Sequence, residues 1–434
     1  MEKIFMVSLG CPKNLVDSEN VLGMLGEKGY ILTDSPEEAD LIIVNTCAFL
    51  EAAVRESESA IARLAGMKAG RDKKLLVCGC LVQRHGQKVL RLKGVDGIAG
   101  AGDPEKVVEA VEKAAHSSRP AVFDKVPVNL PRDIPRLLST YPYAYLKIAE
   151  GCDNRCSYCL IPSLRGPLRS RDERDIIKEA EDLLGMSVRE LLLVAQDTAG
   201  YGRDMGVAGG LEKLLSKLVK TGFPWIRLMY LHPAHVRDGL LEIVAREKSI
   251  CRYLDIPFQH SHPEMMEKMN RPPVDSAGLV EKIRKAVPGI KLRTTLMVGF
   301  PGESESHFRH MLDFVRESRF DRLGVFRYSR EKDTSAYGFR GHVSEEEKGE
   351  RERIIMEAQK KISEEKMSMM EGAVLEVLVE KEGETCYEAR TEFDAPEIDG
   401  RVLIKKGRKK LNPGDFCRVR ITSSDEYDLF ALQA

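Results

Sequence analysis

The middle of the sequence reads Glu150-Gly151-Cys152-Asp153-Asn154-Arg155-Cys156-Ser157-Tyr158-Cys159. This C-x3-C-x2-C loop places three thiols just past an apolar strand candidate, Ala144 to Ile148. Three thiolates on one short loop can hold three irons of a 4Fe-4S cluster, and no fourth Cys or His follows at a spacing that closes a tetrahedral zinc site. One iron then stays open to bind a ligand. The alternative is a structural zinc loop or buried small side chains, which the strand-end position disfavours.

The same strand opens a series in which apolar strands alternate with helical patterns. Its strand candidates are Ala144 to Ile148, Leu191 to Ala195, Ile226 to Leu231, Tyr253 to Ile256, Leu292 to Val298 and Leu323 to Tyr328. Six βα units predict a partial or open TIM-like (βα)6 barrel, which binds ligands at the carboxyl ends of its strands. A charged helix from Ser344 to about Met370 follows this series.

Upstream, the first ~115 residues have a similar rhythm. Short apolar runs at Ile4 to Leu9, Leu41 to Val44 and Leu75 to Val77 alternate with helical patterns, which predicts a doubly wound parallel sheet. A cysteine follows each run, at positions 11, 47 and 80. Because parallel strands end at one edge of a sheet, we expect these thiols to converge and hold a second cluster. The alternative is that all three are buried as small hydrophobes.

The other cysteines need a separate interpretation. In Cys78-Gly79-Cys80 either thiol could be the ligand, but alternation points one of them into the sheet packing, and the strand-end position favours Cys80. Cys251, Cys386 and Cys417 lie in or beside apolar runs, where core packing is expected. In a reducing compartment, ten cysteines favour metal ligands or redox groups over a disulfide framework.

The chain divides into several predicted domains. Residues 117–142 hold five prolines and little periodicity, as in a linker. After residue 370, short strand candidates at Val374 to Glu380, Cys386 to Thr391, Val402 to Ile404 and Phe416 to Ile421 predict a small antiparallel β-barrel. We therefore predict an α/β protein with domains at 1–116, 143–370 and 371–434.

The composition excludes several classes of protein. The 434 residues are 43% hydrophobic and 31% charged, unlike disordered, collagenous or membrane chains. A net charge of -1 gives the protein no overall positive potential that would attract a polyanion such as nucleic acid. The first residues lack the apolar run of a signal peptide, and no later run reaches about 18 apolar residues, so a cytoplasmic protein is expected.

The central loop closely resembles the radical S-adenosylmethionine (SAM) superfamily. In that superfamily the open iron binds the amino and carboxylate groups of SAM, and electron transfer splits SAM to a 5′-deoxyadenosyl radical. The resemblance implies that Tyr158 lies beside the adenine, that Gln196 and Asp197 lie near the SAM amino group, and that Gly299 permits close approach of a ligand. A packed aromatic, strand-end caps and a tight turn are the plainer interpretations.

The amino-terminal segments resemble the methylthiotransferase family. The matching segments are Ser8-Leu9-Gly10-Cys11-Pro12-Lys13-Asn14-Leu15-Val16-Asp17-Ser18-Glu19, Asn45-Thr46-Cys47 and Gly79-Cys80-Leu81-Val82-Gln83-Arg84. The resemblance continues through Ile161-Pro162, Arg165-Gly166 and Arg169-Ser170-Arg171 and ends in a region similar to a TRAM domain, so it covers essentially the whole chain. Pro12-Lys13 matches the RimO branch, whereas the transfer-RNA branch, MiaB, typically has Gln-Met there.

The resemblance to the RimO branch implies methylthiolation of an aspartate in the twelfth small-subunit ribosomal protein. The β-carbon of aspartate has an unactivated C–H bond, which a radical can break. Two 4Fe-4S clusters and two SAM molecules are implied: one SAM donates a methyl group to sulfur on the amino-terminal cluster, and the other gives the radical at the central cluster. An electron donor of the reduced flavodoxin or ferredoxin type is the expected partner, and no membrane partner is expected.

The charge of the carboxyl-terminal barrel bears on its partner. Residues 371–434 carry 10 basic and 14 acidic side chains, a net charge of -4, which suits a basic ribosomal protein better than nucleic acid. Nucleic-acid contact is therefore not the primary expectation, although the basic run Lys405-Lys406-Gly407-Arg408-Lys409-Lys410 could contact phosphate. Two alternatives stay open: a transfer-RNA adenosine methylthiotransferase, and a non-catalytic iron–sulfur module that binds the ribosome.

Overall fold

The computed structural model describes residues 2–68, 72–115, 119–124, 134–407 and 409–434. It contains two compact units. The first comprises Met1–Ser139, Lys147–Asp175 and Glu331–Thr334, and the second Thr140–Leu146, Ile176–Arg330 and Ser335–Ala434. Among the described residues, none of the helices combines the length and the apolar character needed to cross a membrane.

The first unit is built on a parallel sheet, as the sequence predicts. Its strands are β1 (Lys3–Ser8), β2 (Ile31–Leu32), β3 (Leu41–Thr46), β4 (Lys74–Gly79), β5 (Gly97–Ala99) and β6 (Ala121–Val122). They run in the order β2-β1-β3-β4-β5-β6 with parallel pairing throughout. The order reverses direction between β1 and β3, where doubly wound sheets bind ligands. Strand β6 falls inside the expected linker, of which residues 117, 118 and 125–133 lie outside the described ones.

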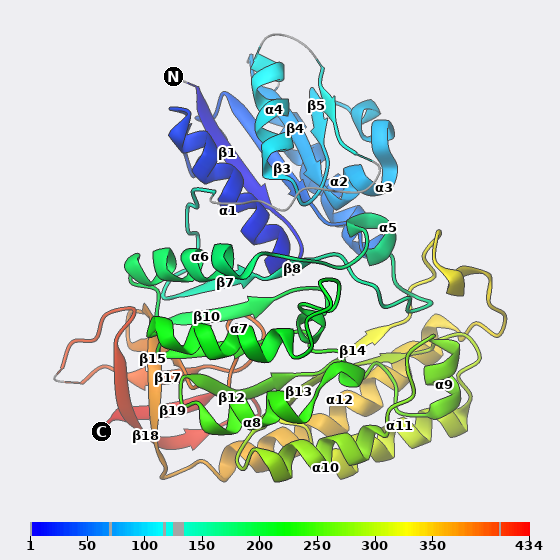
Figure 1. Ribbon diagram of the computed structural model, residues 1–434, viewed down its shortest axis with the longest axis vertical. Coiled ribbons are helices and arrows are strands. Elements are labelled where there is room, and N and C mark those ends of the chain that lie inside the picture. Colours follow the sequence, from blue (N-terminus) through cyan, green and yellow to red (C-terminus); the bar gives the residue numbers. More distant parts are fainter. Residues whose placement is uncertain (1, 69–71, 116–118, 125–133, 408) are drawn as a thin grey trace. The chain divides into compact units, whose positions relative to one another are not determined.

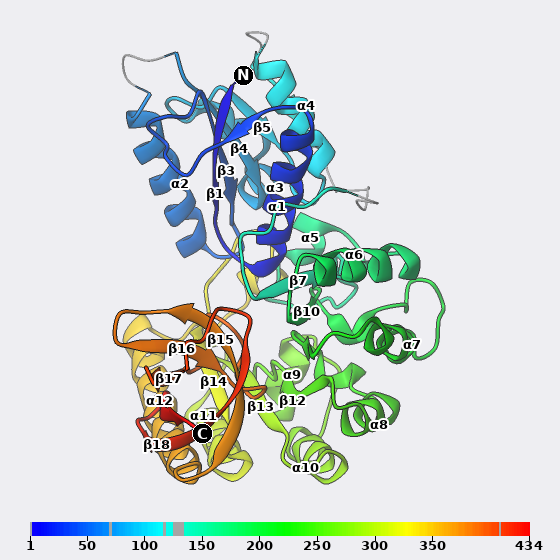
Figure 2. The ribbon, with the colours of Figure 1, turned by 90° about the vertical axis from the view of Figure 1, so that its left-hand side faces the viewer.

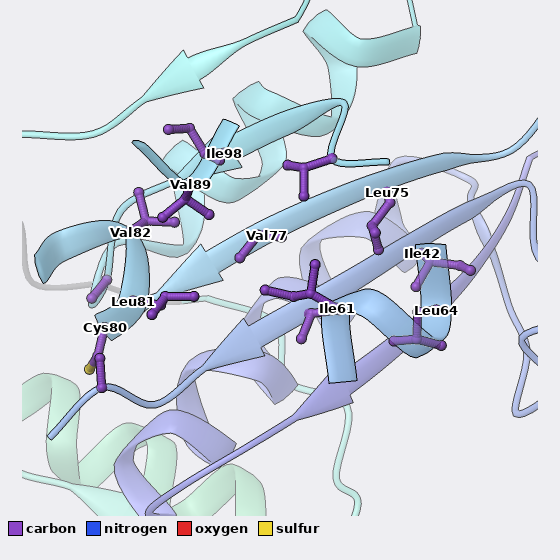
Figure 3. Close-up of a cluster of buried hydrophobic side chains, with 14 of the residues drawn as sticks. Ile42, Ile61, Leu64, Leu75, Val77, Cys80, Leu81, Val82, Val89 and Ile98 are labelled. Atoms are coloured by element: carbon purple, nitrogen blue, oxygen red, sulfur yellow. The ribbon is translucent and has the colours of Figure 1, made fainter. Parts of the chain in front are cut away.

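Helices cover both faces of this sheet, since its strands are apolar on both sides. One face carries α1 (Pro12–Glu27) and α4 (Pro104–Ala115), and the other carries α2 (Glu51–Gly66), α3 (Cys80–His85) and η1 (Gly86–Arg91) (Figure 2). Figure 3 shows the apolar cluster of the second face, with Cys80 at its margin, past the end of the strand that carries Val77. Two short strands, β8 (Ala149–Glu150) and β9 (Arg169–Ser170), and helix α5 (Ile161–Arg165) complete the unit.

The second unit contains all six strands of the predicted partial barrel. They are β7 (Tyr143–Lys147), β10 (Glu190–Val194), β11 (Trp225–Leu228), β12 (Ile250–Asp255), β13 (Lys291–Val298) and β14 (Arg322–Arg327), which follow one another in this order across the sheet. Parallel pairing joins β10 through β14. Between the strands lie helices α6 (Glu173–Gly185), α7 (Gly210–Leu218), α8 (Asp238–Arg246), α9 (Pro263–Lys268), α10 (Ser276–Ala286) and α11 (Glu305–Ser318), and the short turns η2 (Thr198–Gly200), η3 (Val219–Thr221) and η4 (Pro233–His235).

The charged helix predicted after the barrel is α12 (Glu345–Ser368), preceded by η5 (Ser335–Gly338). The hydroxyl of Ser344 accepts a hydrogen bond from the backbone N–H of Glu347 (3.1 Å), and three glutamates occupy the first turn. Both features stabilise the amino end of a helix, because they satisfy a free N–H group and complement the helix dipole.

The carboxyl-terminal domain is a closed five-stranded barrel, in the order β15-β16-β17-β19-β18. The strands are β15 (Val374–Glu382), β16 (Cys386–Arg390), β17 (Val402–Lys405), β18 (Phe416–Ser424) and β19 (Leu429–Gln433). Strand β19 was not predicted from the sequence, and the barrel is not fully antiparallel as expected, because β17 and β19 pair in parallel. Five strands cannot alternate in direction around a closed ring, so one pair must be parallel.

Within the second unit, the small barrel adjoins the amino ends of the large barrel's strands (Figure 1). The segment between β16 and β17 supplies polar partners to strand residues there. Arg293 donates to Asp399 Oδ1 (2.6 Å), and Arg322 donates to Asp394 Oδ1 (2.5 Å). The carboxyl ends of the strands, where barrels of this kind hold their ligands, therefore lie at the opposite end from this small barrel.

Candidate functional site

Three cysteines converge at one edge of the amino-terminal sheet. Cys11, Cys47 and Cys80, here called the amino-terminal trio, follow β1, β3 and β4, whose ends are in register. A Cβ atom at Gly10 would lie 2.7 Å from Cys47 Cβ, so the first two strand ends are closely packed. Burial raises the pKa of Cys80 to about 11, with the nearby Cys11 and Cys47 adding to the rise. The structure therefore brings together the three thiols that the strand-end argument selects.

Amide and hydroxyl side chains tie the three strand ends together. Asn14 Nδ2 donates to the carbonyl oxygens of Leu9 and Thr46, both at 3.0 Å. Asn45 Nδ2 donates to the carbonyl oxygen of Asn14 (2.9 Å). Thr46 Oγ1 donates to the carbonyl oxygen of Cys78 (2.5 Å). No structural role was predicted for these side chains, although each lies within three residues of a candidate ligand.

Glycine precedes two members of the amino-terminal trio for a steric reason. Gly10 and Gly79 both have a φ angle of +93°, in the left-handed region that favours glycine. At Gly79 a Cβ atom would lie 2.3 Å from Asn45 Oδ1 and 2.7 Å from the carbonyl oxygen of Thr46. A larger residue at position 79 would therefore displace the strand end that leads into Cys80.

Cys78 differs from Cys80 in its surroundings. Its side chain is buried in the apolar cluster under α1 and α4. Burial raises the pKa of this thiol far above its usual range, with Asp17 and Cys80 adding to the effect. A metal ligand must be a thiolate, so these surroundings favour Cys80 over Cys78. Cys251 is buried as expected, and Cys386 and Cys417 are half-buried.

The central trio, Cys152, Cys156 and Cys159, lies on the loop between β8 and α5 in the first unit. Backbone hydrogen bonds fix this loop: Cys152 N–H donates to the carbonyl oxygen of Gly166 (3.0 Å), and Cys159 N–H donates to that of Cys156 (3.0 Å). Cys159 Sγ accepts a hydrogen bond from the backbone N–H of Ile161 (3.4 Å), a contact that favours a thiolate. All three side chains are partly exposed, as is Tyr158.

Four buried charged side chains form a network in the first unit. Arg165 Nη1 donates to Asp17 Oδ2 (2.9 Å) and Glu150 Oε2 (3.2 Å). Lys147 Nζ donates to Glu150 Oε2 (3.0 Å) and to Asp17 Oδ1. Burial opposes the charge on Lys147, but the two carboxylates raise its pKa above the usual value. Two cations and two anions are thus paired out of contact with water.

Arg165 also reaches the amino-terminal trio. Its Nη2 atom donates to Cys80 Sγ (3.4 Å) and to Asn14 Oδ1. Arg165 lies six residues after Cys159, so a residue next to the central loop contacts a candidate ligand of the other cluster. Only the family resemblance pointed to Arg165 beforehand, because its partners are far apart in the sequence.

The remaining candidate residues lie in the second unit, at the carboxyl ends of strands. Asp197, after Gln196 and β10, accepts a hydrogen bond from the backbone N–H of His232 (3.3 Å) and pairs with His235 Nδ1 (2.6 Å). Gly299 follows β13, and a Cβ atom there would lie 2.2 Å from Lys348 Cγ. Glycine suits residue 299 because its φ angle is +74° and because the side chain of Lys348 on helix α12 crowds the position. Whether Gln196, Asp197 and Gly299 contact SAM stays a prediction.

One further group among the described residues has metal-ligand chemistry. Ligand atoms of His262, Glu264 and His307 all lie within 4.8 Å of one another. However, His262 Nδ1 accepts the backbone N–H of Glu264 (3.3 Å), and His307 Nδ1 accepts that of Ser304 (3.1 Å). In a neutral ring this places the proton on Nε2, which then cannot ligate. These two histidines act as helix caps.

Three family models match successive parts of the chain. The uncharacterized protein family UPF0004 matches residues 3–100, the radical SAM superfamily matches residues 146–315, and the TRAM domain matches residues 372–433. The radical SAM match includes the central loop, and the UPF0004 match includes all of the amino-terminal trio.

Three relatives that align over nearly the whole chain share the name ribosomal protein uS12 methylthiotransferase RimO. The protein from Pelotomaculum thermopropionicum is 47% identical over 436 residues, which cover 98% of each chain. Those from Thermoanaerobacter sp. and Geobacter sulfurreducens are 43% and 44% identical, with coverage of 98% or more of each chain.

Solved structures of other radical SAM enzymes share the fold. The methyltransferase TsrM from Kitasatospora setae, with cobalamin and a [4Fe-4S] cluster bound, aligns with a TM-score of 0.58 at 15% identity over 77% of each chain. The cobalamin-dependent enzyme OxsB aligns with a TM-score of 0.54 at 11% identity over 83% of this chain and 58% of its own. At such identities the likeness concerns the fold alone.

Proposed function

This chain belongs to the RimO family of ribosomal protein uS12 methylthiotransferases, and from that premise we propose which of its residues serve the reaction. The chain is a radical SAM enzyme that transfers a methylthio group to ribosomal protein uS12, with 4Fe-4S clusters and SAM as cofactors. In our proposal the central trio holds the cluster that binds SAM, and the amino-terminal trio holds the second cluster.

The observation that carries this proposal is the convergence of Cys11, Cys47 and Cys80 at three neighbouring strand ends. Thirty or more residues separate these cysteines in the sequence, so their meeting requires the whole parallel sheet. Three thiols suit a cluster that keeps one iron open, and among the described residues no histidine or carboxylate completes a metal-binding group with them. The three thiols of each trio therefore fit a 4Fe-4S cluster, at the strand ends and on the central loop alike.

The residues of the chain have a limited task in this chemistry. When bound, the clusters and SAM supply the radical and the methylthio group that an unactivated C–H bond requires. The protein must hold the two cluster sites in fixed positions and keep water away from the reacting atoms. The hydrogen bonds of Asn14, Asn45 and Thr46 fix the strand ends that carry the amino-terminal trio. The backbone hydrogen bonds of the central loop fix the central trio.

Several finer assignments form part of the same proposal. The target is the β-carbon of an aspartate in uS12. Tyr158, Gln196, Asp197 and Gly299 are the candidate SAM contacts. The electron comes from a reduced flavodoxin or ferredoxin, both of which pass single electrons. A ribosomal substrate supports a cytoplasmic location, and the proposed domains are 1–116, 143–370 and 371–434.

Two sequence features favour a protein substrate over transfer RNA. Pro12-Lys13 stands where the transfer-RNA branch typically has Gln-Met, and the carboxyl-terminal barrel has a net charge of -4. An acidic surface attracts a basic ribosomal protein and repels phosphate. The basic run 405–410, of which residue 408 lies outside the described residues, is then a secondary contact at most.

The decisive experiment offers both substrates at once. The reconstituted protein is incubated anaerobically with SAM, a reductant, sulfide, uS12 and transfer RNA, and both substrates are analysed by mass spectrometry. We expect a methylthio gain on an aspartate of uS12. A gain on an adenosine would overturn the substrate assignment, and SAM that stays intact under reduction would favour a non-catalytic binding module.

A further inference from the structure

Arg165 occupies a position that fold stability does not explain. Its side chain is 2% exposed, and it forms buried ion pairs with Asp17 and Glu150. Buried ion pairs of this kind are often no more stabilising than apolar residues of similar volume, because removing the charges from water is costly. Four charged groups kept in one buried place therefore suggest a role in the site rather than in the fold.

The geometry of the guanidinium group is fixed from one side. Nη1 donates to the carboxylates of Asp17 and Glu150, and these carboxylates are in turn held by Lys147. With one edge of the planar group held in this way, Nη2 points toward Cys80 Sγ at 3.4 Å. The contact to the sulfur is thus built into the network rather than made by a free side chain.

The charges of the network determine its electrostatic effect on Cys80. The formal charges of the four groups sum to zero, because Lys147 and Arg165 are positive and Asp17 and Glu150 are negative. Of the four, Arg165 is the one with a hydrogen bond to the ligand sulfur. Reduction adds one electron to a cluster, and a hydrogen bond from a cation to a ligand sulfur stabilises the more negative state.

We infer that Arg165 is a positioning residue that raises the reduction potential of the cluster held by Cys11, Cys47 and Cys80. This inference rests on the proposed assignment of Cys80 as a cluster ligand. Asp17 has the opposite effect in the same network, because its negative charge opposes the reduced state. Replacing Arg165 should lower the potential, and neutralising Asp17 should raise it.

The test measures the potential of this cluster alone. The full-length chain carries alanine in place of the central trio, is reconstituted with iron and sulfide under anaerobic conditions, and is titrated with dithionite while electron paramagnetic resonance follows the reduced cluster. The Arg165→Gln and Arg165→Lys proteins should show a lowered potential, with the larger shift in the glutamine variant. The Asp17→Asn protein should show a raised potential.

Arg136 provides a matched control in the same unit. It is also buried and ion-paired, to Glu19 on helix α1, through contacts of 2.5 and 2.8 Å. Glu19 lies eight residues beyond Cys11 on that helix, about 12 Å along its axis. The Arg136→Gln protein should lose stability as the Arg165 variants do, yet keep the parent potential.

The outcomes separate this inference from the proposed function. If the parent chain without the central trio binds no cluster, the ligand assignment itself fails. If that parent chain binds a cluster and the Arg165→Gln and Arg136→Gln variants have equal reduction potentials, the inference about Arg165 fails and the ligand assignment stands. If Arg165→Gln retains no iron, the test uses Arg165→Lys and Asp17→Asn instead. Reduction potentials that shift in the same direction in these two variants would overturn the inference.

Discussion

Arg390, at the end of strand β16 in the small barrel, donates a hydrogen bond to Glu190 at the start of strand β10 (2.5 Å). The same carboxylate accepts a second bond, from Arg227 Nε on β11 (2.6 Å). All three side chains are essentially excluded from water. The carboxylate of Glu190 thus pairs with a cation from each of the two barrels of the second unit, and the TRAM domain is joined to the barrel through buried ion pairs.

Replacing Glu190 by glutamine should therefore destabilise the second unit. Arg227 would lose its carboxylate partner, and Arg390 would keep only that of Glu380. Breaking a buried pair by removing one partner costs about 3–5 kcal/mol. Urea denaturation followed by circular dichroism should show a lower midpoint for Glu190→Gln. The exposed Glu376→Gln on β15 is the control, and equal midpoints for both variants would contradict this account.

The fold was predictable where the signal is local. Apolar runs alternating with helical patterns identified β1, β3 and β4 and all six strands of the partial barrel, because each of these strands is long enough to carry an apolar run or an alternating pattern. Strands of two or three residues, such as β2, β5 and β6, were missed, since so short a run has no periodicity. Strand β19 was missed although Leu429 and Ala431 point inward, because the exposed Phe430 and Leu432 hide the alternation of apolar and polar residues.

The candidate site was predictable in part for the same reason. The position of Cys11, Cys47 and Cys80 after apolar runs was enough to predict their convergence, because parallel topology brings strand ends together. The network of Arg165 with Asp17 left no local pattern, since 148 residues separate its members. Likewise, the crowding of Gly299 by Lys348 depends on how α12 packs, which no motif around residue 299 reveals.

The two trios should separate in their effects on activity. Cys11→Ala or Cys47→Ala should abolish methylthio transfer to uS12 while reductive cleavage of SAM continues, because the central trio is intact. Cys152→Ala should stop both reactions. Chromatography for 5′-deoxyadenosine and mass spectrometry of uS12 report the two steps independently.

Cys78→Ala is the internal control for those variants. The Cys78 side chain packs among apolar residues, so its loss should leave both reactions and the iron content unchanged. Loss of the second cluster in this variant would show that the wrong thiol of Cys78-Gly79-Cys80 was chosen. Undiminished transfer by Cys11→Ala would refute the second cluster site altogether.

Gly79→Ala should prevent binding of the cluster at the amino-terminal trio, although it replaces none of the cysteines. The added Cβ would lie 2.3 Å from Asn45 Oδ1, at a φ angle of +93°. Two full clusters hold about eight iron atoms per chain, and we expect this variant to retain about four. Gly289→Ala is the matched control, since its φ is +82° but nothing lies within 4 Å of the added Cβ. It should suffer similar backbone strain and keep its iron, as colorimetric iron analysis can check.

His232 should make the stability of the protein depend on pH. Burial lowers the pKa of His232 to about 3, and the charge of Arg271 adds to the effect. In the unfolded chain a histidine titrates near pH 6.5, so between about pH 3 and 6.5 the unfolded state binds more protons than the folded state. The contribution of His232 is therefore complete above pH 6.5 and declines as the pH falls, by about 1.4 kcal/mol between pH 7.5 and 5.5.

His232→Asn isolates this contribution. His232 Nδ1 accepts the backbone N–H of Ala234 (3.3 Å), and asparagine can accept the same hydrogen bond at a helix start without titrating. Urea midpoints measured at pH 7.5, 6.5 and 5.5 should therefore fall less steeply in the variant than in the parent chain. Parallel pH dependence in the two proteins would mean that His232 is protonated in the folded state, which its burial beside Arg271 argues against.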